Sequence, residues 1–194
     1  MRARLFMVVA VCLLLLAPSA HADWNAGEAA KWIQLPDLET TGIDINGTGP
    51  FILADDFECT ETGYITGIHL WSSWRSDILP ANGPDQVAFI LSIHEDIPAE
   101  QSPTGYSMPG AVLWWRQFGP GDFTVRPFAE GIEEGWMTPP DNYGFPGDTV
   151  CWQYNFRVPI DGAFLQEGSP DQPRVYWLDV QARPLEPGPE WGWK

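Results

Sequence analysis

The sequence predicts an all-β fold: an antiparallel two-sheet β-sandwich of the jelly-roll type with one short N-terminal helix. Nineteen glycines and nineteen prolines are spread through the chain and cut it into segments of strand length. No helical period of apolar residues persists for fifteen residues, and several segments instead alternate apolar and polar residues. Short alternating strands with almost no helix between them favour a sandwich over a parallel α/β fold, and a barrel is the alternative.

The chain begins with a segment typical of a secretory signal peptide, residues 1–22. Arg2 and Arg4 form its basic region, an apolar run follows, and residues 20–22 form a small-residue cleavage site. The apolar run is too short to span a bilayer. We therefore expect a secreted protein, extracellular or in the cell envelope, with a single domain at 23–194 and no membrane insertion after cleavage.

The elements follow in a simple order. Asn25 can cap a short helix over residues 25–32, which Pro36 would end. Turn signals rich in glycine, proline and asparagine then separate the expected strands. These are residues 52–58, 65–71, 87–94, 112–118, 123–128, 150–156, 163–167 and 175–182.

The clearest strand is 87–94, because its residues alternate most regularly. Val87, Phe89, Leu91 and Ile93 share one face, and Ala88, Ile90, Ser92 and His94 share the other.

Two cysteines remain after signal cleavage, Cys59 and Cys151. An exported chain meets an oxidising compartment, so we expect them to form one disulfide. A bridge between an early and a late strand would stabilise the fold by about 4 to 5 kcal/mol in the chain-entropy model, less any strain.

Acidic residues dominate the charge. Removal of Arg2 and Arg4 with the signal peptide leaves eight of the ten basic residues against 26 acidic ones, so the formal net charge falls from −16 to −18. Such a surface repels nucleic acid and anionic lipid. Excess carboxylate also keeps a tryptophan-rich surface soluble, so acidity alone does not indicate a cation.

The sequence carries no recognisable catalytic motif. The nearest approach to a nucleophile elbow, 105–109, lacks the second glycine, and His69 and His94 do not form a zinc-protease pattern. Glycoside hydrolysis requires only two carboxylates across a cleft, so a hydrolase stays open. Neighbouring pairs such as Asp55-Asp56 and Glu133-Glu134 would point to opposite faces of a strand unless a bulge intervenes.

One segment partly resembles a calcium loop. Asp44 and Asn46 alternate before a glycine, and Asp55 falls where such a loop has its last acidic ligand. These residues are the candidate Ca²⁺ ligands, and a surface turn without an ion is the alternative interpretation.

Eleven tryptophans follow residue 22. Adjacent Trp114 and Trp115 must point to opposite sides of their strand, so the tryptophans cannot all face the core. Trp74 and Trp136 lie in expected loops, where their flat apolar faces could bind a sugar. The alternative is that these loops fold their tryptophans down as lids on the core.

Eight segments together resemble an uncharacterised family of secreted bacterial proteins, of the kind found in planctomycete-type genomes. The resemblance covers most of the mature chain and implies export, but it implies no activity, ligand or catalytic residue. Relatives often continue past the last segment, which implies a truncated C-terminus that leaves Trp191 and Trp193 without partners. The segments are 31–37, 54–59, 65–74, 96–99, 109–114, 151–156, 175–180 and 192–194.

The leading functional hypothesis is a secreted, non-catalytic binding or surface-structural domain, with polysaccharide or cell-envelope components as its partners and carbohydrate as the favoured ligand class. The competing hypothesis is a small jelly-roll glycoside hydrolase that uses a carboxylate pair. Apart from the possible Ca²⁺, no cofactor is expected.

Overall fold

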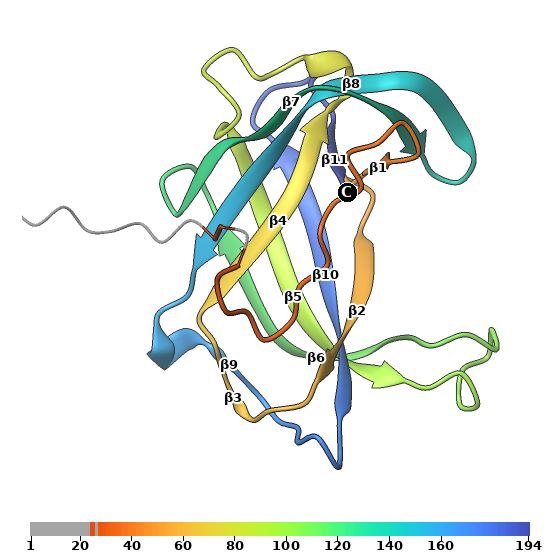
Figure 1. Ribbon diagram of the computed structural model, residues 1–194, viewed down its shortest axis with the longest axis vertical. Helices are drawn as coiled ribbons and strands as arrows, with labels where there is room; N and C mark the ends of the chain where they lie inside the picture. The colour runs from red at the N-terminus through yellow and green to blue at the C-terminus, as the bar shows by residue number, and fades with distance from the viewer. Residues whose placement is uncertain (1–23, 26) are drawn as a thin grey trace, which may run out of the picture.

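The computed structural model describes residues 24–25 and 27–194, and its regular structure in this range is β-strand, with two three-residue 3₁₀ turns at Arg75–Asp77 and Ile160–Gly162 (Figure 1). The expected helix over 25–32 is not formed, because residues 27–32 adopt a turn and bends. Helices this short are marginal without packing support. None of the helical segments in the described range is long and apolar enough to cross a membrane. The expected signal peptide lies outside the described residues.

Five strands close into a barrel in the order β1-β11-β4-β8-β7. All neighbours pair antiparallel except β1 and β7, which run parallel and close the ring, with Ile43 opposite Gly135 and Ile45 opposite Met137. The strands are β1 (Ile43–Asn46), β4 (Gly67–Trp74), β7 (Phe123–Thr138), β8 (Asn142–Arg157) and β11 (Trp191–Trp193).

This closure makes the predicted antiparallel jelly-roll sandwich wrong. Strands β7 and β8 are much longer than expected, and their pairing shifts register between Glu130 and Glu134. Gly131 adopts the left-handed φ of +73° within that shift, a conformation that favours glycine. Because a bulge bends a strand and increases its twist, the far halves of β7 and β8 curve over the top of the molecule and reach β1 (Figure 1).

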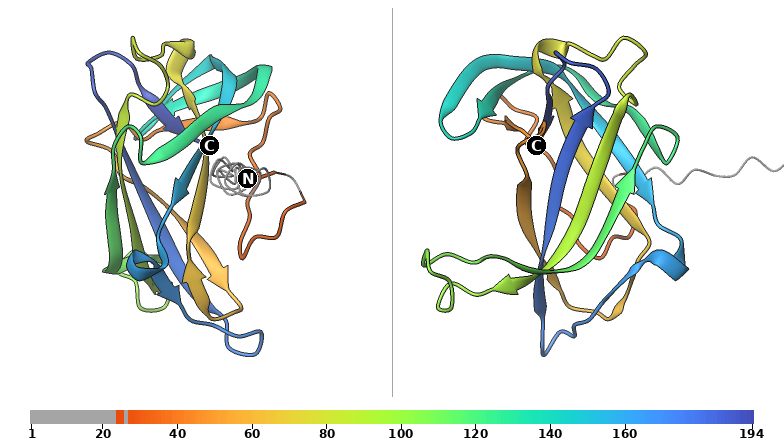
Figure 2. Two further views of the ribbon diagram at one scale, coloured as in Figure 1. Left: turned by 90° about the vertical axis from the view of Figure 1, so that its left-hand side faces the viewer. Right: turned by 180° about the vertical axis from the view of Figure 1, so that it is seen from behind.

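A separate four-stranded antiparallel sheet has the order β2-β10-β5-β6 and forms the face seen from behind in Figure 2. A two-stranded sheet of β3 and β9 lies below it. Each of the eight expected segments overlaps an observed strand, whereas β1, β3 and β11 were not predicted. The strands are β2 (Leu53–Cys59), β3 (Gly63–Ile65), β5 (Val87–Ile97), β6 (Met108–Phe118), β9 (Phe164–Gln166) and β10 (Arg174–Pro184).

The main apolar core lies between the four-stranded sheet and the outer face of the barrel. The alternation expected for β5 is confirmed, and its face with Val87, Phe89, Leu91 and Ile93 is the buried one. Phe89 contacts four aromatic rings at centroid distances of 5.1 to 5.3 Å, and all four rings come from the barrel. They are Phe123, Tyr154, Phe156 and Trp191, of strands β7, β8 and β11.

Cys59 and Cys151 are both free and buried, so the structure does not contain the expected disulfide. Cys59 packs with Ile93 and Tyr176, whereas Cys151 packs with Trp24 in a different cluster. One thiol thus belongs to the four-stranded sheet and the other to the barrel. Burial raises the pKa of Cys59 to about 11 and raises that of Cys151 further.

Candidate functional site

A cleft of about 430 Å³ lies between the N-terminal segment and strands β2, β3 and β4. In this segment the Lys31 ammonium lies 3.5 Å from the Glu61 carboxylate. Aromatic rings form much of its lining: Trp24, Trp32, Phe57, Tyr64, Trp71 and Trp193.

Two of these rings are accessible. Trp32 is 48 % exposed and Tyr64 is 45 % exposed, whereas Trp24 and Trp71 are buried and meet edge to face at a centroid distance of 5.6 Å. The buried pair makes a rigid wall, and the exposed rings offer flat apolar faces to a bound molecule.

Polar side chains line the same cleft, among them Gln34, Asp55, Asp56 and His69. Burial raises the pKa of the Asp55 carboxyl. The Nδ1 of His69 lies 2.6 Å from Asn155 Oδ1, which fixes the ring and favours the tautomer with the proton on Nδ1. In that tautomer Nε2 is an acceptor, so the cleft combines ring faces with hydrogen-bonding groups.

Neither Trp74 nor Trp136 lies in a loop or in this cleft. Trp74 ends β4 and is 0 % exposed, with its indole N–H donating to the Tyr154 hydroxyl at 3.1 Å. Trp136 lies in β7 and is 2 % exposed, with its indole N–H donating to Thr138 Oγ1 at 3.2 Å. Both indoles are packed inside the protein and present no face to a ligand.

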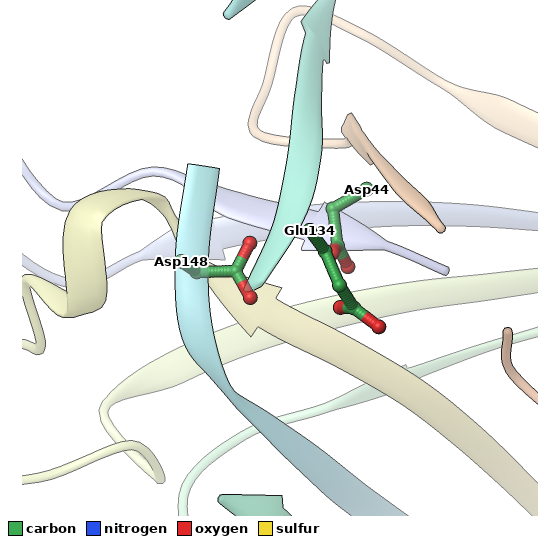
Figure 3. Close-up of side chains that lie close together, drawn as sticks. All are labelled: Asp44, Glu134 and Asp148. Atoms are coloured by element: carbon green, nitrogen blue, oxygen red, sulfur yellow. The ribbon is translucent and has the colours of Figure 1, made fainter. Parts of the chain in front are cut away.

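Three buried carboxylates meet inside the barrel, and we call them the carboxylate cluster: Asp44 of β1, Glu134 of β7 and Asp148 of β8 (Figure 3). Each offers an oxygen that lies within 4.8 Å of an oxygen of the other two. Strand pairing places them there, because Glu134 is opposite Asp148 and Asp44 is opposite Trp136. Directly opposed residues share a side of the barrel wall, so the three side chains converge.

Lys194 connects the cluster to the cleft. Its ammonium donates to Asp44 Oδ2 at 2.8 Å and to Glu134 Oε2. Its backbone N–H donates to the Trp71 carbonyl at 3.1 Å, and the residue also lines the cleft. The cluster therefore lies directly behind one end of the cleft.

The protonation of the cluster follows from its burial. Desolvation raises the pKa of Asp44, although Lys194 opposes that shift. Desolvation, with repulsion from Asp44, raises the pKa of Asp148 to about 8. Desolvation also lowers the pKa of Lys194. Without further positive charge, the site therefore favours a protonated Asp148.

The candidate calcium ligands do not form the expected loop site. Asn46 Oδ1 accepts the Thr48 N–H at 2.9 Å in a local turn, and Asp55 belongs to β2 of the other sheet. Only Asp44 lies in the carboxylate cluster, and its partners follow it by about ninety to one hundred residues in the chain. The Glu133-Glu134 pair was the one local signal, and Glu133 is indeed exposed while Glu134 is buried.

Comparison with known families matches residues 30–194 to a domain of unknown function, DUF7901. Comparison with curated proteins and with solved structures gives no match.

Proposed function

The chain belongs to the DUF7901 family, and we propose from its own geometry that it is an extracellular, non-catalytic domain that binds polysaccharide in the aromatic cleft. The observation that carries the proposal is the pairing of exposed ring faces, Trp32 and Tyr64, with fixed polar groups in one cleft of about 430 Å³. A few polar groups within a concave, largely apolar lining are typical of ligand sites.

The ligand class follows from charge and from the shape of the lining. Asp55 and Asp56 lie in the cleft, and the whole chain has a formal net charge of −16. An anionic polymer would be repelled, so the domain selects a neutral polysaccharide of the cell envelope or its surroundings. Flat rings pack against the apolar faces of sugar rings, while Gln34, His69 and the carboxylates bind the hydroxyl groups.

The experiment is affinity electrophoresis of the purified protein in gels that contain neutral polysaccharides, with an anionic polysaccharide as the charge control. Trp32→Ala and Tyr64→Ala remove exposed rings from the cleft, so both variants should remain folded. Each should weaken binding about tenfold or more, as expected for a central aromatic contact. Trp115→Ala is the matched control, because Trp115 is 66 % exposed and lies in β6 outside the cleft. Retardation unchanged by either cleft variant would reject the site, and binding to none of the polysaccharides would favour a purely structural role.

A glycoside hydrolase is the second candidate, and one observation favours it: Asp55 and Asp56 both line the cleft, and partial desolvation shifts the pKa of Asp55 upward, the direction that a general acid needs. Their adjacent positions on β2 argue against a facing pair. Reducing-sugar release from a bound polysaccharide, lost in Asp55→Asn, would replace the binding proposal with the hydrolase.

A further inference from the structure

The carboxylate cluster holds oxygen atoms that its lysine does not satisfy. Lys194 binds only one oxygen of Asp44 and one of Glu134. Within the described part of the chain, the second oxygen of each, Asp44 Oδ1 and Glu134 Oε1, has no hydrogen-bond partner, and neither has either oxygen of Asp148. Buried acceptors without donors are rare and costly, so four together require an explanation.

A neutral side chain from another strand points to the same place. Ser73 of β4 is fully buried, and its hydroxyl lies against Asp44 and Asp148, close enough to lower the pKa of both carboxyls. Even so, no well-formed hydrogen bond joins Ser73 Oγ to any group among residues 24–25 and 27–194. Ser73 therefore adds a fifth buried oxygen without a well-formed hydrogen bond, and this oxygen belongs to a neutral side chain.

The charge of the site is also unbalanced. With all three carboxyls ionised, the carboxylates and the one ammonium leave a formal charge of −2 in a buried volume. Uncompensated buried charge is strongly unfavourable, and one divalent cation would neutralise it.

We propose that the carboxylate cluster binds one Ca²⁺ ion inside the barrel, through Asp44, Glu134, Asp148 and the Ser73 hydroxyl. Hard cations prefer such an all-oxygen set, and Ca²⁺ accepts six to eight oxygens at about 2.3 to 2.6 Å. Two oxygens on one Ca²⁺ can thus lie up to about 5 Å apart, which accommodates carboxylate oxygens within 4.8 Å of one another. Mg²⁺ requires a tighter octahedron and is the comparison ion.

The ion explains how the barrel closes. Strands β1 and β7 share only three paired positions, and β1 has four residues. One ion bound by β1, β7, β8 and β4 would link four of the five barrel strands from inside. The site is therefore structural, and it goes beyond the proposed ligand cleft.

Thermal unfolding and calorimetric titration of the purified protein, first stripped with EDTA, test the proposal. CaCl₂ at about 100 times its Kd should raise Tm by roughly 5 to 10 °C, and titration should give one site per chain. MgCl₂ at the same concentration should have a smaller effect. Asp148→Asn, which keeps the side-chain shape, should weaken Ca²⁺ binding at least tenfold and lose most of the Tm rise.

Glu133→Gln is the matched control, because it removes an exposed carboxylate one residue from Glu134. It should keep both the single site and the full Tm rise. Tb³⁺ luminescence excited through the tryptophans gives a second readout, and Ca²⁺ but not Mg²⁺ should displace the emission at low concentration. A Tm unchanged by Ca²⁺ in the wild-type protein, or equal loss of binding in Glu133→Gln and Asp148→Asn, would overturn the assignment.

Discussion

The two sides of the barrel wall carry opposite chemistry. On the outer side, Leu70, Tyr154 and Phe156 pack against the four-stranded sheet in an apolar core. On the inner side, Ser73 of β4 points away from the face that carries Leu70, and it meets Asp148 of β8 and further acidic groups. Because successive side chains of a strand point to opposite faces, one strand can contribute to both the apolar core and the barrel interior. Apolar burial stabilises the apolar core at any pH, whereas the stability of the barrel interior depends on charge balance.

The largest expected effect on stability concerns the apolar core. Phe89→Ala removes a ring that contacts four others, so we expect a loss of about 3 to 5 kcal/mol in the free energy of unfolding. Urea denaturation measures it, and Trp115→Ala should cost less than about 1 kcal/mol. EDTA and Ca²⁺ should not change the size of the Phe89→Ala loss. A loss that depended on the ion would contradict the independence of the apolar core and the barrel interior.

The second largest effect on stability is expected in the carboxylate cluster inside the barrel. Lys194→Met leaves Asp44 and Glu134 without their ammonium, and breaking a buried ion pair costs about 3 kcal/mol or more. Urea denaturation in EDTA at pH 7 should show this loss, and Asp44→Asn in the same chain should restore part of it. An unchanged denaturation midpoint would mean that the ammonium does not stabilise the cluster.

A smaller effect, the dependence of stability on pH, is expected from the barrel interior and not from the apolar core. The pKa of Asp148 is raised to about 8 in the folded protein, whereas the unfolded chain releases this proton near pH 4. The unfolded state therefore loses the proton first, and metal-free wild-type protein should lose stability as pH rises from about 4 to 8. Asp148→Asn in EDTA removes this slope and should unfold at a higher temperature at pH 7 than wild type. Parallel pH profiles for the two proteins would contradict the raised pKa.

The smallest effect is expected from reducing agent. Because Cys59 and Cys151 are free, a reductant should shift Tm by less than about 1 °C, whereas loss of a disulfide would remove several kcal/mol. Their raised pKa values and burial should also block alkylation of the native protein at pH 8. Denatured, unreduced protein that lacks residues 1–22 should show two thiols, and a count of zero would restore the disulfide.

Part of the apolar core could be predicted from the sequence, whereas the carboxylate cluster could not. Alternation is a local property of one strand, so the sequence alone indicates that one face of β5 is apolar, the face with Val87, Phe89, Leu91 and Ile93. The carboxylate cluster depends on a register shift near Gly131 and on the pairing of β1 with β7, which are about ninety residues apart. No local pattern encodes such pairing, so Asp44 was noticed only as part of a calcium-like turn.

The tryptophans show the same limit. Trp74 and Trp136 were expected in loops because they follow the predicted ends of their strands. In the structure, β4 and β7 continue past those ends and bury both indoles. Trp32 was expected in a helix, and its place beside the cleft depends on how an irregular segment lies across β3 and β4. Irregular segments carry no periodicity from which exposure can be inferred.

The most direct test of the polar barrel interior is a crystal structure of the protein grown with CaCl₂, with data collected for anomalous scattering. The account predicts one anomalous peak inside the barrel, within about 2.3 to 2.6 Å of oxygens from Asp44, Glu134 and Asp148. A cluster without a peak, in which Asp148 shares a proton with Asp44 and Lys194 alone supplies positive charge, would contradict it.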